Sequence, residues 1–383
     1  MIYKFIKILT HTKFYIKKPY RKKILIYDRT SAEEIKEFFE NKEDIFVLDT
    51  RKETINLFVI LKLIFKFKKI NFRNYLKTYI ELIDPKAIIT FIDNNIFFYE
   101  LKKYFQKKIF ISIQNGFRFA VDDMLDDLIK KKEINKEYKS DKYFVMNNVI
   151  SKELGKYIRS DFVTIGSIRN NKVKINLNNI EKNTVCYVSR FSGIFKSYTL
   201  GHNLNYLEKN FSKSEWIWLN FCIDLLKNTS KFCKKNNLQL KILVKSIRES
   251  DLEKKFCKKI LGNDQFAFLD KDNVLSNYYY LDKMEVIVNT MSTLGYEALG
   301  RKKKVAFFSD KKMLGANFGW PEILDEKGFF FSNSNSYEEV ERVISNLRNI
   351  KNDEWLSTVE NYIPVSCYYN YQNTILKNFL KTL

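Results

Sequence analysis

Strand-like apolar runs alternate with helical segments along most of this 383-residue chain, beginning near residue 23. The apolar runs are short and continuous, as in strands that are buried on both faces of a sheet. Helical patterns separate these runs. Helices that connect successive strands make the strands parallel and cover both faces of the sheet. This alternation restricts the chain to an α/β fold built on parallel sheets.

The alternation is interrupted by a polar stretch, rich in Asn and Lys, over residues 169–182. Because the chain is too long for one small domain, this stretch is the best linker candidate. We expect one Rossmann-like domain over residues 1–168 and a second Rossmann-like domain over residues 183–350. Residues 351–383 are expected to be helices that return to the first domain. The expected fold class is therefore α/β, with two doubly wound domains facing each other across a cleft.

Apolar runs and their boundary residues predict the individual elements. In the first domain, the expected strands are 23–28, 44–49, 87–92, 109–113, 142–146 and 162–165. The expected helices are 31–39, with Ser31 and Glu34 as a capping box, 55–67, 72–83 and 97–105. In the second domain, the expected strands are 184–188, 240–244, 265–269, 286–288 and 305–308. Its expected helices are 216–233, 252–261, 275–281, the one that opens at 292, and 337–347.

The formal net charge of +22 indicates an anionic partner, such as nucleic acid, anionic lipid or a phosphorylated small molecule. Part of the excess follows from a bias toward Lys, Asn, Ile, Phe and Tyr, which AT-rich codons favour. The basic clusters are short, as at Lys130–Lys132 and Arg301–Lys304, and no nucleic-acid-binding module is visible. We therefore expect no nucleic-acid partner, whereas an anionic membrane surface fits the charge.

Cysteine and histidine usage argues against disulfides and metal sites. The five cysteines are far apart and lack CxxC spacing, which is typical of buried thiols in a reducing compartment. The only histidines are His11 and His202, which excludes a His-rich metal site. The acidic pairs Asp122-Asp123 and Asp126-Asp127 could hold Mg²⁺, but adjacent acids on a helix mostly face solvent.

The chain shows neither a secretory signal nor a membrane-spanning stretch. A spanning helix needs ~18–20 uncharged apolar residues. The nearest approach, residues 55–67, is interrupted by Lys62 and Lys66. It predicts a buried helix, or an interfacial one whose lysines reach the surface. The expected location is cytoplasmic, peripheral to the inner face of the cytoplasmic membrane.

Ligands of open parallel sheets bind outside the carboxyl ends of the strands. The chain has no GxGxxG or GxxxxGK[ST] motif, so neither a dinucleotide fingerprint nor a P-loop is expected. Residues 286–299 run from an apolar strand through a polar turn into a helix, with Ser292 and Thr293 suited to the N-cap. The free N–H groups and the dipole of that helix predict an anion site, with an ordinary capped helix as the alternative.

Four motifs in this chain resemble those of GT-B glycosyltransferases. They are Ile92-Asp93-Asn94, Ile113-Gln114-Asn115-Gly116, Ile165-Gly166-Ser167 and residues 292–299. In order and spacing they are similar to motifs of bacterial surface-polysaccharide biosynthesis proteins and, more distantly, of capsular Kdo transferases that use CMP-linked donors. The resemblance implies transfer of a sugar from a nucleotide sugar to a surface-glycan acceptor, with a Kdo-like acid from a CMP donor as one option. It also implies that residues 1–168 form the acceptor-side domain and residues 183–350 the nucleotide-sugar domain.

One departure bears on the donor. Related Kdo and sialyl transferases often carry His-Pro after the strand that here ends at Lys245, and this chain has Lys245-Ser246-Ile247-Arg248 instead. Lys245 or Arg248 is then expected to contact the donor phosphate in place of the histidine. Trp320, in the loop 319–321, suits sugar stacking but is expected to be a buried structural residue.

The chemistry of sugar transfer assigns roles to these residues. The leaving phosphate of an oxocarbenium-like transition state must be neutralised, here without a metal or cofactor, by cations, hydroxyls and helix N–H groups. Asp93 is the expected catalytic base, with Asp28 and Glu100 as alternatives. Glu297 is expected to accept hydrogen bonds from ribose hydroxyls. The predicted donor-binding residues are Gln114, Asn115, Gly116, Arg190, Lys245, Arg248, Ser292, Thr293 and Glu297.

The predicted partners are a CMP-, UDP- or GDP-linked sugar, a glycan or lipid-linked acceptor, and the anionic membrane surface. Two alternatives stay open. One is a GT-B-like sugar-nucleotide epimerase, which would act without an acceptor. The other is a non-catalytic basic protein that binds nucleic acid or lipid and has no nucleotide site.

Overall fold

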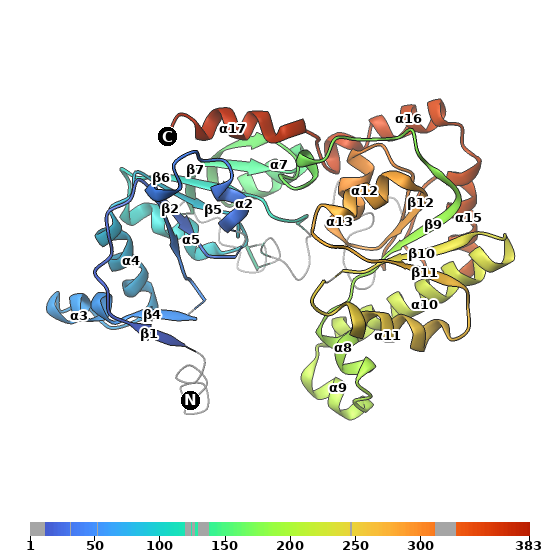
Figure 1. Ribbon diagram of the computed structural model, residues 1–383, viewed down its shortest axis with the longest axis horizontal. Helices are drawn as coiled ribbons and strands as arrows, with labels where there is room; N and C mark the ends of the chain where they lie inside the picture. Colours follow the sequence, from blue (N-terminus) through green and yellow to red (C-terminus); the bar gives the residue numbers. More distant parts are fainter. Residues whose placement is uncertain are drawn as a thin grey trace.

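The computed structural model describes residues 12–30, 32–51, 53–118, 124, 127–128, 138–245, 247–310 and 327–383. Each of its two lobes is built on a six-stranded sheet (Figure 1). All strand pairs within the two sheets are parallel. The expected fold class, two Rossmann-like α/β domains, is confirmed. Ser31, the acidic residues 122, 123 and 126, Ser246 and the loop 319–321 lie outside the described residues.

The first sheet has the strand order β3-β2-β5-β6-β7-β8. Its central strands are buried along their whole length, which explains their continuous apolar sequences. Its strands are β2 (Ile24–Tyr27), β3 (Ile45–Leu48), β5 (Ala87–Thr90), β6 (Ile109–Ile113), β7 (Lys139–Val145) and β8 (Arg159–Thr164).

Helices and short 3-10 turns connect these strands. The 12 residues of α4 begin after Asn71, whose side chain accepts from the N–H of Asn74, and end at Asp84, which is left-handed and precedes Pro85. The connecting elements are α2 (Ala32–Lys36), η1 (Lys42–Asp44), α3 (Leu57–Phe65), α4 (Phe72–Ile83), α5 (Ile96–Leu101), η2 (Lys102–Tyr104) and α7 (Asn148–Gly155).

Several elements of the first lobe differ from the sequence expectation. Helix α2 ends at Lys36 instead of residue 39, and strands β7 and β8 each start three residues earlier than expected. A two-stranded parallel sheet joins β1 (Lys13–Tyr15) to β4 (Thr54–Asn56), so residues 55–56 belong to a strand and the helix starts only at Leu57. Asn56 ends the strand and caps the helix, because its side chain accepts from the N–H of Phe58. The helix α7 was also not expected between residues 146 and 162.

The second sheet has the strand order β11-β10-β9-β12-β13-β14. The linker candidate contains η3 (Asn170–Lys172) and leads into β9, which starts three residues earlier than expected. Its strands are β9 (Glu181–Val188), β10 (Gln239–Leu243), β11 (Phe266–Leu269), β12 (Met284–Asn289), β13 (Val305–Phe308) and β14 (Phe331–Ser332).

The helices around the second sheet include the 23-residue α10, which begins with a capping box formed by Ser212 and Glu215. Two short helices before it, α8 and α9, were not expected from the sequence. The helices are α8 (Gly193–Thr199), α9 (Leu204–Asn210), α10 (Lys213–Lys235), α11 (Ser250–Leu261), α12 (Ser276–Lys283), α13 (Thr293–Gly300) and α15 (Tyr337–Asn349).

The C-terminal segment contacts both lobes. After α16 (Asn352–Glu360), η4 (Ile363–Val365) and η5 (Tyr371–Asn373), the helix α17 (Thr374–Leu380) lies along the first lobe (Figure 1). Leu376 and Leu380 of α17 are buried in the same core as strands β2, β5 and β6. Trp355 of α16 instead donates to the carbonyl of Lys302 in the second lobe.

Candidate functional site

A pocket of about 200 Å³ lies at the carboxyl ends of the second sheet, where it faces the first lobe. It contains residues that follow β9, β10, β11 and β12, together with residues that follow β6 and β8 of the first sheet. This is the place where an open parallel sheet is expected to bind a ligand. Its lining consists of Asn115, Ser167, Arg169, Val188, Ser189, Leu243, Val244, Lys245, Lys271, Val274, Asn277, Tyr278, Ser292, Thr293, Leu294 and Glu297.

The first turn of α13 forms one wall of this pocket. Ser292 is the N-cap, and its hydroxyl accepts from the N–H of Leu294 at 3.4 Å. Gly295 lets the helix approach β12 closely, because a Cβ at this position would come 2.1 Å from the side chain of Asn289. The sequence therefore brings the positive end of a helix dipole to the edge of the pocket.

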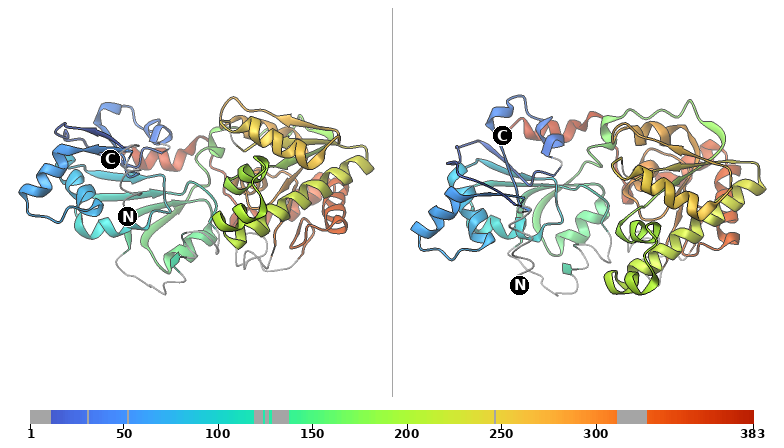
Figure 2. Two further views of the ribbon diagram at one scale, coloured as in Figure 1. Left: turned by 90° about the horizontal axis from the view of Figure 1, so that it is seen from below. Right: turned by 60° about the horizontal axis from the view of Figure 1, so that its bottom comes forward.

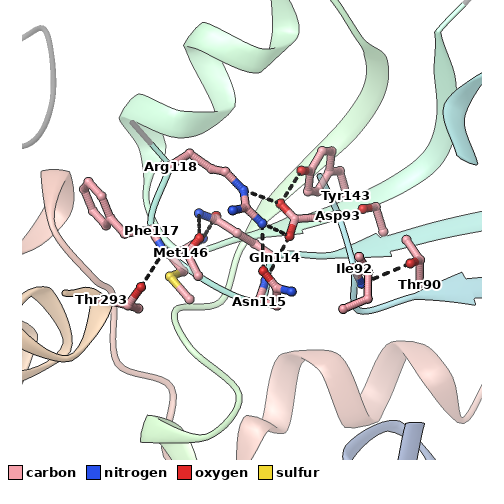
Figure 3. Close-up of polar contacts among 12 residues, drawn as sticks. Thr90, Ile92, Asp93, Gln114, Asn115, Phe117, Arg118, Tyr143, Met146 and Thr293 are labelled. Atoms are coloured by element: carbon pink, nitrogen blue, oxygen red, sulfur yellow. Dashed lines mark hydrogen bonds and ion pairs between the residues drawn. The ribbon is translucent and has the colours of Figure 1, made fainter. Parts of the chain in front are cut away.

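Thr293 has a different role from the cap that the sequence suggested. Its hydroxyl accepts from the backbone N–H of Phe117 at 2.9 Å and so links the second lobe to the first (Figure 3). Beside this bond, the rings of Phe117 and Tyr296 stack with centroids 3.7 Å apart. Gly116 belongs to the same contact, since a Cβ there would lie 3.3 Å from the Thr293 hydroxyl.

Three cationic side chains line the pocket. Lys271 donates to the carbonyl of Lys245 at 2.7 Å and to the side chain of Asn277 at 3.2 Å. Burial lowers the pKa of Lys271, and burial together with the charge of Arg190 lowers that of Lys245. Arg169 comes from the first lobe and pairs with Glu34 at 2.6 Å. The pocket thus gathers positive charge from both lobes.

Glu297 is the one carboxyl side chain among the described residues that line the pocket. It is buried and accepts from the hydroxyl of Tyr278 at 3.1 Å. Burial raises the pKa of Glu297 to about 7, although hydrogen bonds from Ser167 and Tyr278 oppose the shift. A carboxyl group that titrates near neutrality inside a cationic pocket is a functional candidate.

Asp93, the expected base, lies in a closed network beside the pocket (Figure 3). Its side chain has no exposed surface. Both carboxylate oxygens bind Arg118, and they also accept from Tyr143 at 2.8 Å and from the backbone N–H of Asn115 at 3.1 Å. This arrangement disfavours a base at Asp93, because its oxygens are occupied and shielded from any acceptor hydroxyl.

The same network shapes the loop after β6. Arg118 also donates to the side-chain oxygen of Asn115 at 2.7 Å. Gln114 is buried; its amide accepts from the N–H of Met146 at 2.7 Å and donates to the carbonyl of Gly116 at 2.8 Å. Gln114 therefore holds the loop, and Asn115 is the residue of this motif that reaches the pocket.

The two alternative bases are also engaged. Asp28 is buried and binds Thr50, Arg51 and the N–H of Thr30. Burial would raise the pKa of Asp28, but the hydrogen bonds from Thr50 and Thr30 outweigh it and lower the pKa. Glu100 pairs with Arg73 at 3.0 Å. Neither lines the pocket.

Arg190 lies next to the pocket and does not line it. Its guanidinium stacks over the ring of Trp218, with the carbon 4.9 Å from the centroid. Burial lowers the pKa of Arg190. Arg248 lies in an exposed turn beyond Lys245, outside the pocket lining.

Five of the predicted site residues thus meet in the pocket: Asn115, Lys245, Ser292, Thr293 and Glu297. The prediction missed Arg169, which the sequence places in the polar linker, and Asn277 and Tyr278 on α12. Lys271 follows the end of β11 by two residues, where ligand-binding side chains are expected, but it was not among the predicted donor-binding residues. For Arg169, the signal was its position shortly after the strand end at Gly166-Ser167.

The basic cluster Arg301–Lys304 is largely internal. Arg301 is buried and binds Asp282, Asn170 and the carbonyl of Val173. Lys303 is also buried and donates to the carbonyl of Asp282 at 2.8 Å; burial lowers its pKa to about 8. Arg301 and Lys303 are therefore engaged inside the protein, whereas Lys302 is exposed.

Among the residues that the structure describes, no three His, Cys, Asp or Glu side chains gather in a way that could hold a metal ion. All five cysteines are buried and unpaired. Within the same ranges, no helix combines the length and the apolar character needed to cross a membrane.

Residues 109–383 match the family described as "putative O-antigen biosynthesis protein". This match covers more than half of the chain and includes both the loop after β6 and α13. The chain belongs to this family. Its family is therefore one of surface-polysaccharide biosynthesis. No sequence among the curated proteins matches it.

Solved structures show the same GT-B arrangement of two Rossmann-like domains. The UDP-GlcNAc 2-epimerase from Neisseria meningitidis bound to UDP-GlcNAc has a TM-score of 0.50 at 13% identity, covering 97% of this chain and 100% of the epimerase. A glycosyltransferase from Rickettsia africae has a TM-score of 0.49 at 14% identity, over 99% of this chain and 91% of that one.

A third similar structure is S. aureus TarM, in a complex that includes UDP. It has a TM-score of 0.43 at 17% identity and covers 81% of this chain. The chain spans 58% of the length of TarM. The likeness to the epimerase, at 13% identity, concerns the fold.

Proposed function

We propose that this protein is a metal-independent glycosyltransferase that transfers a sugar from a nucleotide sugar to a surface-glycan acceptor. The observation that carries the proposal is the pocket at the sheet edge, where Arg169, Lys245 and Lys271 converge beside the first turn of α13. Cations and helix N–H groups together can neutralise a leaving phosphate or diphosphate without a metal ion.

Within this proposal the second lobe holds the donor. The diphosphate or phosphate lies against Ser292, Lys245 and Lys271. The carboxylate of Glu297 accepts hydrogen bonds from hydroxyl groups of the ribose or sugar. Asn115 and Arg169 reach the donor from the first lobe. Gln114 and Gly116 act by fixing the loop, and Arg190 and Arg248 contribute longer-range positive charge.

Asp93 is assigned as a positioning residue. It fixes Arg118 and Asn115, and through the loop it supports the contact between Phe117 and Thr293. Glu297 is the pocket carboxyl whose pKa of about 7 suits proton transfer near neutral pH. We therefore propose that Glu297, and not Asp93, is the residue that gains or loses a proton in the site.

The nucleotide can be CMP-, UDP- or GDP-linked, and the fold likeness to a UDP-GlcNAc-bound epimerase makes UDP-GlcNAc the first donor to test. A CMP-linked Kdo-like acid remains the second choice. We place the protein in the cytoplasm, at the inner face of the cytoplasmic membrane, where it would meet a glycan or lipid-linked acceptor.

The test is release of free nucleotide from each donor, measured with and without a membrane extract that supplies acceptor. A glycosyltransferase releases nucleotide faster when acceptor is present. The Lys271→Gln variant should lose most of this release. Lys259→Gln is the matched control, because Lys259 also donates to a backbone carbonyl, that of Tyr198 at 3.1 Å, but lies outside the pocket.

An epimerase remains the rival, since one neighbour with the same fold is a UDP-GlcNAc 2-epimerase. It would convert the donor to its epimer without acceptor, which chromatography of the sugar nucleotide detects. Acceptor-independent epimer formation would replace the transferase proposal.

A further inference from the structure

An exposed apolar surface lies at the outer end of the first lobe, far from the pocket. It is formed by residues 14–20, which include the end of β1, and residues 57–70, which include α3; we refer to it as the outer face. Figures 1 and 2 show α3 and β1 at the end of the first lobe that points away from the second lobe. The most exposed apolar side chains here are Ile16, Phe65 and Phe67, at 67%, 75% and 98%.

The sequence of α3 leaves this helix without a polar side. Eight of its nine residues are apolar, and Lys62 is the exception. Val59 and Leu63 are fully buried against the lobe, whereas Leu61, Ile64 and Phe65 face outward. A surface helix normally presents polar side chains to water, so apolar side chains on both sides indicate that the outer side has a partner.

Phe67 strengthens this indication. It follows α3 with a φ of 50°, the left-handed region that non-glycine residues rarely adopt. Its ring is nearly fully exposed, so no packing within the described part of the chain offsets this conformation. The backbone thus presents an aromatic ring outward at the end of the helix.

The two segments of the outer face are fixed to each other. Strand β1 pairs with β4, which leads directly into α3. The side chain of Asn56 donates to the carbonyl of Lys17 at 2.7 Å, and the hydroxyls of Tyr15 and Tyr79 lie 2.7 Å apart. The exposed Phe14, Tyr15 and Ile16 therefore belong to the same end of the lobe as α3.

Positive charge accompanies these apolar side chains. Residues 14–20 and 57–70 contain six Lys and no Asp or Glu. Lys66 and Lys68 pair with Glu81 of α4, at 2.8 and 3.2 Å. Lys17, Lys18, Lys62 and Lys69 are exposed as well. A partner for this face must accept apolar side chains and balance a positive charge.

We propose that the outer face docks onto the surface of an anionic lipid bilayer. The exposed side chains of α3 and β1 enter the boundary between headgroups and acyl chains, while the lysines reach the anionic headgroups. Each lysine near such a surface strengthens binding by roughly fivefold. This inference stands apart from the proposed sugar transfer, because it uses residues that do not line the pocket.

The test is sedimentation of the full chain with phosphatidylcholine vesicles, either pure or containing phosphatidylglycerol. The wild-type chain should bind the anionic vesicles and release them at high salt. The double variant Phe65→Ser, Phe67→Asn should bind the anionic vesicles at least roughly tenfold more weakly than wild type. Asn is chosen at position 67 because it tolerates the left-handed backbone. The pair Lys62→Gln, Lys69→Gln should also weaken binding.

A matched control is Leu200→Ser with Tyr279→Ser, two exposed apolar residues of the second lobe, which should leave vesicle binding unchanged. Circular dichroism and thermal unfolding of every variant check that the chain is folded. Equal binding by wild type and the Phe65, Phe67 variant would overturn the proposal. The proposal would also be overturned if wild type were a dimer and the Phe65, Phe67 variant were a monomer. The outer face would then contact a second copy of the chain.

Discussion

Glu297 connects the chemistry of the pocket to the stability of the fold. Its pKa rises from 4.5 to about 7 because the carboxyl is buried. Below pH 4.5 the group is protonated in both states and costs nothing. Between pH 4.5 and about 7 the unfolded chain releases its proton first, so stability falls as pH rises. Above this window the full cost of the buried carboxylate is present.

Glu297→Gln removes this titration. The shift corresponds to about 3 kcal/mol of unfolding free energy. We therefore expect the variant to gain that stability relative to wild type between about pH 5 and pH 8. Urea unfolding of both proteins at the two pH values measures the difference. If the difference in unfolding free energy between wild type and variant did not change with pH, Glu297 would have an ordinary pKa.

Asp93→Asn separates the positioning role from that of a base. The substitution removes the charge that balances the buried Arg118. Breaking a buried ion pair costs about 3–5 kcal/mol, so the variant should be strongly destabilised. Thermal unfolding followed by circular dichroism gives the result. A variant that unfolds like wild type but has lost all transfer activity would instead restore Asp93 as a catalytic residue.

The residue types at the site could be predicted only in part. Strand ends are visible in sequence, so Asn115, Lys245 and Ser292 were found. Whether a polar residue at a strand end faces the ligand or a neighbouring residue depends on tertiary partners. Asp93 is an example, because Arg118 and Tyr143, which occupy it, lie 25 and 50 residues further along the chain.

At the scale of elements, the close approach of α13 to β12 decides the shape of the pocket. Gly295→Ala would place a Cβ 2.1 Å from the side chain of Asn289. Overpacking of this kind costs about 1–3 kcal/mol, and moving α13 should also weaken nucleotide binding. Differential scanning fluorimetry with and without nucleotide measures both effects.

Gly155→Ala in α7 is the matched control for this substitution. A Cβ at Gly155 would lie 3.6 Å from Phe162, an ordinary contact. We expect this variant to keep both its stability and its nucleotide affinity. If Gly295→Ala behaved like the control, close packing of α13 would not be needed for the site.

Long elements with a clear period were predicted well, and short ones were missed. The bounds of α4 and β6 match the expectation, because Asn71 and Pro85 delimit the helix and Lys and Gln flank the strand. Strands β1, β4 and β14 have two or three residues each. Such segments form only through pairing with distant residues, which no local pattern records.

At the scale of the molecule, α17 joins the end of the chain to the first sheet. Leu376 is fully buried there, and Phe379 packs on Phe144 with ring centroids 5.3 Å apart. Leu376→Ala should lower the stability of the first lobe by about 2–5 kcal/mol, even though the residue lies at the far end of the sequence.

Hydrogen exchange locates this effect. Loss of protection in β5 and β6 with β9 unchanged is expected, because Leu376 shares its core with the first sheet. Uniform loss in both sheets would show that the two lobes unfold as one unit. The domain limits proposed from the polar linker would then need revision.

The arrangement of the two lobes follows from the α/β alternation, but their contact does not. The hydrogen bond from Phe117 to Thr293 and the ring stack of Phe117 on Tyr296 join residues about 180 positions apart. This contact brings Asn115 and Arg169 to the cationic pocket of the second lobe. A donor held there would touch both lobes.

The central claim is that this pocket binds the nucleotide of a sugar donor. Isothermal titration calorimetry with CMP, UDP, GDP and dTDP tests it most directly, on the wild type, Lys271→Gln and the control Lys259→Gln. We predict that wild type and Lys259→Gln bind at least one of these nucleotides with the same affinity, and that Lys271→Gln binds it roughly tenfold more weakly. Binding of none of the four by wild type, or equal binding by all three proteins, would contradict the claim.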